Sequence, residues 1–265
     1  MEIDGKEDDD LRGRSDGDDA YDDDDGDGGT SIVGKYAVQK TDGIMFQTIG
    51  NYSYHNGKHF TQGLTYSRSS DMLFESNGIY GKSSVCRLDP ATGEALKCVN
   101  MKREYFAEGM QVYGKAGEEK LIQITWKEKI GFIYDATTLD VIGNFTFTTA
   151  KNEGWGICYD EDNHEFIVSD GSEYLHFWDA DSLEEKRRVA VTRQGGREAR
   201  NINELEFVNG KVLANVWYED VILVIDPKSG ECESEYGECS WVASYLYSIA
   251  LSTFVRRLTY PSIFV

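Results

Sequence analysis

Four polar side chains that could carry out chemistry recur along this chain at nearly even spacing, each beside a short apolar run. They are Gln62, Glu108, Glu153 and Asn203, and successive members lie 46, 45 and 50 residues apart. Carboxyl and amide groups can transfer protons and orient a polar substrate, so the four would make one catalytic or binding site if the fold brings them together. A fixed period in this range is typical of repeat architectures.

Each of the four is followed about 25 residues later by an aspartate in a turn sequence, and these are Asp89, Asp135, Asp179 and Asp226. Short strand-like runs lie between, and no stretch combines a sustained 3.6-residue apolar period with helix caps. We therefore expect an all-β propeller, in which each repeat is one antiparallel sheet and the innermost strands line a common axis. The aspartates are expected to cap their own turns.

Aromatic residues accompany the polar set: Phe60, Phe106, Trp126, Trp155 and Trp217. An apolar pocket with a few polar groups is the usual composition of a small-ligand site, and a carboxyl group there should have a raised pKa. The competing interpretation is structural, with axial polar groups bonding to one another and tryptophans wedging the sheets apart. The four histidines show no zinc-type pairing, and no serine elbow or phosphate-binding loop is visible, so we expect no metal and no cofactor.

The formal net charge is −20, and residues 1–29 hold 14 acidic and 3 basic side chains. We expect residues 1–30 to be a disordered acidic tail, 31–233 to form the blades, and 234–265 to be a divergent apolar segment in place of the last blade. The tail could attract a cationic partner or simply solvate the chain, and the second interpretation is favoured. Acidity in both parts argues against a nucleic-acid partner.

The chain opens without a secretory signal, and the apolar run 241–255 is short for a membrane span, so no stable membrane insertion is expected. Two glycosylation-type triplets begin at Asn51 and Asn144. Cys86 and Cys98 flank a turn almost symmetrically. A cross-strand disulfide and two free thiols both stay open, and free thiols are favoured.

Many strings in order, from about Ile44 to Glu233, resemble the plant-type glutaminyl-peptide cyclotransferases, or glutaminyl cyclases. Among them are Phe60-Thr61-Gln62-Gly63-Leu64, Phe106-Ala107-Glu108-Gly109, Glu153-Gly154-Trp155-Gly156, Asn203-Glu204-Leu205-Glu206 and Ala214-Asn215-Val216-Trp217. The resemblance implies a five-bladed β-propeller, here with four recognisable blades and an incomplete fifth. It also implies conversion of N-terminal glutamine of peptides or proteins to pyroglutamate with release of ammonia.

The resemblance further implies that Glu108 is the catalytic residue and that others surround the substrate: Phe60, Gln62, Phe106, Trp126, Trp155, Asn203 and Trp217. Glu153 joins the substrate-binding set from the repeat pattern. The resemblance suggests a monomer of the secretory pathway, extracellular or vacuolar. Residues 234–265 lack the lysine-containing stretch that ends the family's fifth blade, so we expect a truncated or aberrant version of a longer protein, poorly folded or weakly active.

Two other functions stay open. Glu108, Glu153 and Asn203 offer the hard oxygen ligands that calcium prefers, as in a propeller hydrolase that depends on a divalent cation. A degenerate, inactive propeller could instead serve as an interaction module.

Overall fold

The computed structural model describes residues 40–41, 44–45 and 60–237, and every regular element in these ranges is a β-strand. The described ranges contain no helix long and apolar enough to cross a membrane. The chain divides into two units, Met1–Gln47 and Thr48–Val265. In the first unit, β1 (Lys40–Thr41) pairs with β2 (Ile44–Met45) in an antiparallel hairpin. The rest of the strand predicted from Ile44 to Asn51 lies outside the described residues.

The second unit contains four four-stranded antiparallel sheets, each made of strands consecutive in sequence. The first comprises β3 (Thr61–Ser67), β4 (Met72–Asn77), β5 (Ser84–Leu88) and β6 (Ala95–Asn100). The second comprises β7 (Ala107–Tyr113), β8 (Lys120–Thr125), β9 (Ile130–Asp135) and β10 (Val141–Thr146). The third comprises β11 (Ile157–Asp160), β12 (Glu165–Val168), β13 (Tyr174–Asp179) and β14 (Glu185–Ala190). The fourth comprises β17 (Ile202–Val208), β18 (Lys211–Val216), β19 (Val221–Ile225) and β20 (Cys232–Gly237).

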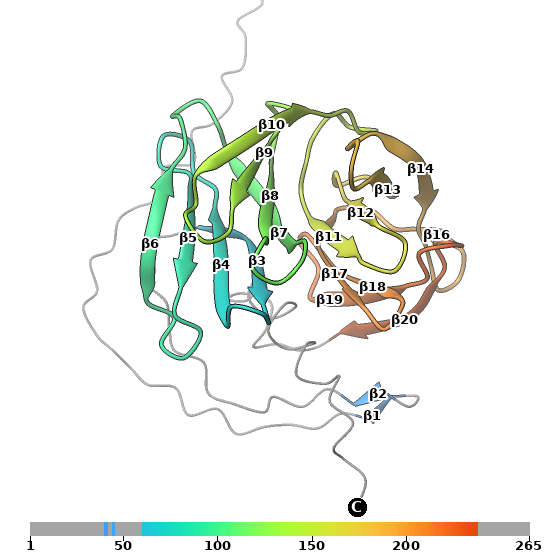
Figure 1. Cartoon of the computed structure of the whole chain (residues 1–265). Coiled ribbons are helices and arrows are strands. Elements are labelled where there is room, and N and C mark those ends of the chain that lie inside the picture. The colour runs from blue at the N-terminus through green and yellow to red at the C-terminus, as the bar shows by residue number, and fades with distance from the viewer. Residues whose placement is uncertain (1–39, 42–43, 46–59, 238–265) are drawn as a thin grey trace, which may run out of the picture. The chain divides into compact units, whose positions relative to one another are not determined.

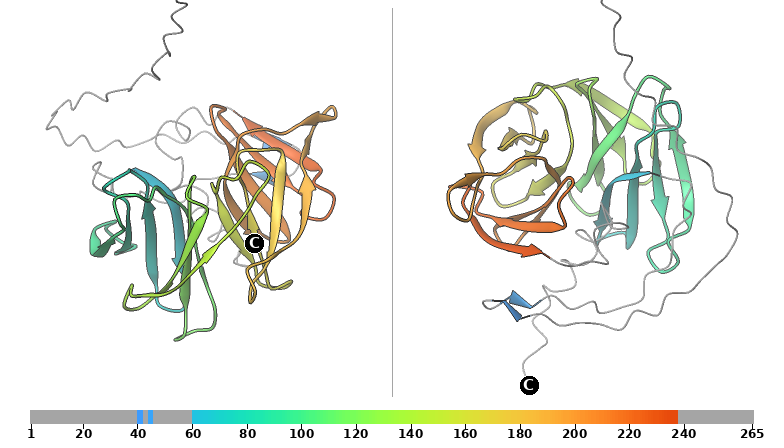
Figure 2. Two further views of the ribbon diagram at one scale, coloured as in Figure 1. Left: turned by 90° about the horizontal axis from the view of Figure 1, so that it is seen from above. Right: turned by 180° about the vertical axis from the view of Figure 1, so that it is seen from behind.

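The four sheets follow one another in chain order around an arc, with β3, β7, β11 and β17 innermost (Figures 1 and 2). The short hairpin of β15 (Thr192–Arg193) and β16 (Arg197–Glu198) lies between the third and fourth sheets in sequence. The predicted all-β propeller is therefore confirmed, with four blades described. The segments from which a fifth blade would come, 46–59 and 238–265, lie outside the described residues. Strand β20 continues to Gly237, so the boundary predicted at residue 233 falls inside it.

Apolar cores fill the spaces between successive sheets. Phe74 of the first sheet packs in one cluster with Leu121 and Tyr134 of the second. Ile124 of the second packs with Trp178 of the third, and a further cluster joins the third and fourth sheets. The outer strands β6, β10 and β14 are largely exposed. Burial of both faces of the inner strands and exposure of the outer ones is the pattern expected of radially stacked sheets.

The four turn aspartates act as predicted. Asp89 Oδ1 accepts hydrogen bonds from the N–H groups of Ala91 and Thr92, at 2.7 and 3.2 Å. The carboxylates of Asp135, Asp179 and Asp226 accept from the two corresponding N–H groups of their own turns. These side chains close the hairpins between the third and fourth strand of each blade and are structural.

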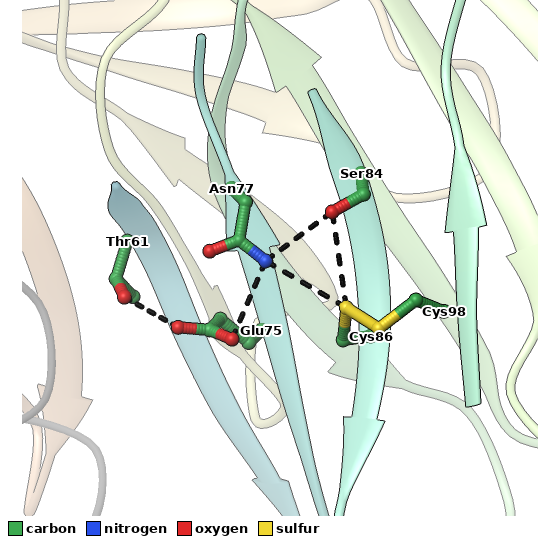
Figure 3. Close-up of a disulfide and its surroundings, with 6 residues drawn as sticks. All are labelled: Thr61, Glu75, Asn77, Ser84, Cys86 and Cys98. Atoms are coloured by element: carbon green, nitrogen blue, oxygen red, sulfur yellow. Dashed lines mark hydrogen bonds between the residues drawn. A yellow bond between two sulfur atoms is a disulfide. The ribbon is translucent and has the colours of Figure 1, made fainter. Parts of the chain in front are cut away.

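Cys86 and Cys98 lie directly opposite each other on β5 and β6 and form a disulfide (Figure 3). The expectation of free thiols at these positions is therefore wrong. The symmetric positions of the two cysteines about the turn are compatible with a disulfide or with free thiols. The strand register pairs Cys86 with Cys98 and so brings the two sulfur atoms within bonding distance. The disulfide is next to buried polar groups of β4, where Asn77 Nδ2 lies 3.3 Å from both Glu75 Oε2 and Ser84 Oγ. Cys158 and Cys232, in the described part of the chain, are buried free thiols.

Candidate active site

The innermost strands touch through glycines, and these contacts define which residues are equivalent in successive blades. A Cβ placed on Gly63 would lie 2.6 Å from Met110 N, and one on Gly109 would lie 2.6 Å from Trp155 O. A Cβ on Gly156 would lie 2.2 Å from Asn203 O. No side chain fits at such distances from backbone atoms, so glycine at these three positions allows each inner strand to approach the next one directly.

The residues that directly precede these contact positions therefore occupy the same place in successive blades. They are Gln62, Glu108, Trp155 and Asn203, spaced 46, 47 and 48 residues apart. The prediction that Glu153 shares this position is wrong, because Gly156 rather than Gly154 contacts the fourth sheet. Gly154 packs instead on Phe147 and the carbonyl oxygen of Thr125. Three of the four predicted residues, together with Trp155, occupy equivalent places on or just before the inner strands of neighbouring blades.

Serine hydroxyls of the second strands fix two of these positions. Ser76 Oγ donates to the carbonyl oxygen of Glu108, and Ser169 Oγ donates to that of Asn203, both at 2.5 Å. Between the second and third blades, Gly109 N–H donates directly to Trp155 O at 2.7 Å. Each of the first three blades thus forms a hydrogen bond to the backbone of Glu108, Trp155 or Asn203 in the next blade. These hydrogen bonds give the site rigid support.

Glu153 reaches the same site from the loop before β11. Its Oε2 atom accepts hydrogen bonds from the indole Nε1–H of Trp126, at 2.8 Å, and from that of Trp155, at 2.9 Å. Thr149 Oγ1 donates to the Glu153 carbonyl oxygen at 2.7 Å and accepts from its N–H at 3.1 Å. One carboxylate oxygen therefore orients two indole rings that belong to different blades.

The aromatic residues form a wall that continues across the blades. Phe106 lies edge-on to Tyr80 and to Trp126, with ring centres 5.2 and 5.6 Å apart. Trp155 meets Trp217 of the fourth blade at 6.5 Å. Phe60, which directly precedes β3, is 46% exposed. Edge-to-face ring pairs of this kind stabilise a fixed arrangement and leave ring faces for a ligand.

Glu108 is the buried carboxyl group of the site. Its side chain is 6% exposed, and Gln62 and Asn203, at the equivalent positions, are buried as well. Burial raises the pKa of Glu108 well above its usual range, and the nearby charges of Glu153 and Glu128 raise it further. A carboxyl group whose pKa is raised in this way holds its proton at a higher pH than a free carboxyl group and can both give and take it.

Glu128 and Tyr80 belong to the site although the repeat pattern missed them. Glu128 Oε1 accepts a hydrogen bond from Tyr80 OH at 2.8 Å, and its Oε2 is 3.4 Å from the Phe106 N–H. Burial, this hydrogen bond and the neighbouring carboxylates raise the pKa of Tyr80 to about 12. Both residues lie in loops whose fold depends on contacts between blades. The only sequence signal is their position, just after Trp126 and just before the strand of Ser84–Leu88.

A second buried acid, Glu204, occupies the position held by glycine in the other three blades. Burial raises its pKa well above the usual range, as do the charges of Glu206 and Glu108, and its Oε2 makes no hydrogen bond. Within residues 40–41, 44–45 and 60–237, no three His, Cys, Asp or Glu side chains are arranged to hold a metal ion.

Comparison with known proteins shows the family to which the chain belongs. The family model described as glutamine cyclotransferase matches residues 30–244. The chain belongs to the glutamine cyclotransferase family. A glutaminyl-peptide cyclotransferase of Arabidopsis thaliana is 39% identical over 176 residues, which are 66% of this chain and 52% of that protein. The chain thus spans about half the length of this curated relative. The crystal structure of Myxococcus xanthus glutaminyl cyclase superimposes on this chain with a TM-score of 0.61 and 29% identity, covering 71% of this chain and 75% of that one.

Proposed function

We propose that this protein converts the N-terminal glutamine of peptides or proteins to pyroglutamate and releases ammonia, with Glu108 moving the proton. The observation that carries the proposal is the buried carboxyl group of Glu108, whose pKa is raised and whose position on its inner strand is equivalent to those of the buried amides Gln62 and Asn203. Membership of the glutamine cyclotransferase family supports the choice of reaction.

The reaction needs a base and an acid at nearly the same place. The neutral α-amine attacks the γ-carboxamide carbon, a new C–N bond closes the five-membered ring, and the bond to the amide nitrogen breaks. The ionised form of Glu108 takes the proton that the attacking amine nitrogen loses as the ring closes. Its protonated form returns a proton to the departing nitrogen, which leaves as ammonia. The carboxyl group ends in its starting state, so no other reactant is required.

The remaining residues bind and fold the substrate. Gln62 and Asn203, buried amides at the positions equivalent to Glu108, are suited to orient the carboxamide and to stabilise the developing oxyanion. Phe60, Phe106, Trp126, Trp155 and Trp217 would enclose the folded glutamine side chain and exclude water. Because nucleophile and carbonyl belong to one molecule, holding that folded shape supplies a large part of the rate enhancement. Glu153 contributes by fixing the two indoles.

The cellular setting proposed is the secretory pathway, with an extracellular or vacuolar destination and a monomeric protein. The disulfide of Cys86 and Cys98 supports an oxidising compartment. Asn144, the first residue of a glycosylation-type triplet, is exposed on the outer strand β10, where a glycan would find room.

The proposal is tested by following ammonia release from a short peptide that begins with glutamine, using the full chain and a Glu108→Gln variant. We expect the substitution to lower kcat by roughly 100-fold or more, the range of general acid–base catalysis. Glu161→Gln, on an exposed turn after β11, is the matched control and should keep full activity. Equal cyclisation by Glu108→Gln and the native protein would remove Glu108 from the mechanism, and no cyclisation by the native chain would refute the activity.

A further inference from the structure

A buried cluster of charged groups lies in the third blade, next to the loop that carries Glu153. We call Asp170, Ser172, His176 and Glu185 the Asp170 cluster. Asp170 and His176 are fully buried, with Asp170 Oδ2 3.3 Å from His176 Nε2. Glu185 Oε2 is 3.1 Å from the other ring nitrogen, Nδ1. Both ring nitrogens of His176 therefore lie within reach of carboxylate oxygens.

Asp170 is held as an anion. Burial alone would raise its pKa, but hydrogen bonds from His176, Ser172 and the Lys151 N–H outweigh burial and lower the pKa below its usual range. Ser172 donates to Oδ1 through both its N–H, at 3.0 Å, and its hydroxyl. Donors thus point at both carboxylate oxygens. If asparagine replaced Asp170, its NH₂ group would face a hydrogen-bond donor in either orientation of the side-chain amide. At least one of the present hydrogen bonds would therefore be lost.

The cluster holds the loop of residues 149–153. The Lys151 N–H donates to Asp170 Oδ2 at 2.7 Å, and the Ala150 N–H lies 3.4 Å from His176 Nε2. Lys151 Nζ also donates to the Gly171 carbonyl oxygen at 2.6 Å. Two residues further on, Glu153 receives the two indole hydrogen bonds, so a shift of this loop moves the carboxylate that orients both rings.

The turn at Gly171 also supports the indole of Trp155 and the edge of the fourth blade. Gly171 has a φ of +73°, and a Cβ there would lie 2.5 Å from the Trp155 ring, so the backbone lies flat against the indole. The Gly171 carbonyl oxygen accepts from the Asn201 N–H at 3.0 Å, and the Asn201 carbonyl oxygen accepts from the Trp217 N–H at 2.8 Å. The turn at Gly171 therefore contacts the loop of Glu153 and the ring of Trp155. Through Asn201 it is also hydrogen-bonded to the backbone chain that holds Trp217.

We propose that Asp170 is a positioning residue for the candidate active site: anchored by His176 and Ser172, it sets the loop of Glu153 and the ring of Trp155. Asp170 acts through these groups and does not itself touch the substrate. The inference rests on the proposed function for its catalytic consequence only. Its structural consequence, a fixed environment for the indoles of Trp126 and Trp155, can be measured without any substrate.

The test is Asp170→Asn in the full chain, read by the indole ¹H–¹⁵N resonances, which are assigned with single Trp→Phe variants. We expect the Trp126 and Trp155 resonances to move, because their hydrogen bonds to Glu153 change. The value of kcat/KM for the glutamine peptide should fall by about 10- to 100-fold, as for a displacement of about 1 Å in a site. The loss should lie mainly in kcat. Asp160→Asn is the matched control, since Asp160 is equally buried in the same sheet but bonds only to Asn163 in its own turn.

A folded Asp170→Asn variant that keeps both indole resonances and kcat/KM would overturn the proposal, as would an equal effect from Asp160→Asn. If Asp170→Asn fails to fold, Ser172→Ala decides, because it removes one donor to Asp170 and leaves the charge in place. We expect a smaller movement of the same two resonances, and their constancy would overturn the proposal. A native chain that releases no ammonia refutes the proposed function, while the indole resonances still decide the role of Asp170.

Discussion

Replacing Gly156 by alanine tests the contact through which the third blade positions Asn203, a residue of the proposed active site. Gly156 directly precedes β11, and the added Cβ would lie 2.2 Å from Asn203 O and 2.7 Å from Glu204 Cα. Both neighbours are backbone atoms of β17, so neither can rotate out of the way. The two inner strands must separate.

The size of the separation follows from ordinary contact distances. A carbon atom rests at 3.4 Å or more from such neighbours, so the Asn203 oxygen has to move away by about 1.2 Å. Overpacking of this kind costs roughly 1–3 kcal/mol. In a domain of this size that corresponds to a fall in Tm of about 2–12 °C. Displacing Asn203 by about 1 Å relative to Glu108 should lower kcat/KM on the order of 100-fold.

Thermal unfolding and ammonia release from a glutamine peptide measure the two effects, with activity assayed well below the Tm of the variant. Gly143→Ala is the control, because its Cβ would meet only Ile133, at 3.8 Å, on the outer strand β10. It should leave both Tm and kcat/KM nearly unchanged. The reasoning would be refuted if Gly156→Ala matched the control. A variant that lost stability but kept its activity would show that this contact does not position Asn203 for catalysis.

Two further predictions concern pH. Glu108 must be ionised to accept a proton, so kcat/KM should fall as the pH drops through its pKa, which burial, Glu153 and Glu128 raise. Glu128→Gln removes one raising charge and should move this acid limb to lower pH, whereas an unmoved limb would exclude the coupling. For Glu204 the pKa is higher in the folded than in the unfolded state, so its contribution to stability is complete below the unfolded pKa and is lost as the pH rises through the folded pKa. Glu204→Gln should therefore raise Tm more at pH 8 than at pH 5, and an equal change at both would contradict this.

The sequence is sufficient to predict the blades but not the register of the third one. Turn aspartates such as Asp89 and Asp226 and the repeated polar residues specify sheets of known order, because their chemistry is local. In the string Glu153-Gly154-Trp155-Gly156, two glycines flank one tryptophan, and either could be the contact residue. Only the close approach of β17, the inner strand of the fourth blade, identifies Gly156 as the contact residue. The distance between Gly156 and β17 depends on how the blades assemble.

Residues that act from loops were not predictable in the same way. Glu128 joins the site because the turn after β8 brings it to Tyr80, which is 48 residues earlier in the sequence. Asp170 matters because Lys151 presents an N–H to it across 19 residues. Neither contact follows from periodicity, which reports burial within a strand and not which loops meet. Trp126 and Trp217 were predicted from the sequence, and both directly follow the second strand of their blade, β8 or β18.

Two buried carboxyl groups near the site have opposite pKa shifts, and the difference explains what each can do. At Glu108, burial and like charges raise the pKa, so the group can hold and release a proton at a higher pH than a free carboxyl group. At Asp170, the donors from Lys151, His176 and Ser172 outweigh burial, so the charge persists and can serve as a fixed anchor. An amide at position 108 would therefore remove the proton carrier from an intact site, whereas an amide at position 170 would leave the carrier and disturb the geometry around it. A change in the pH profile should accompany the first substitution, and a change in the indole resonances should accompany the second.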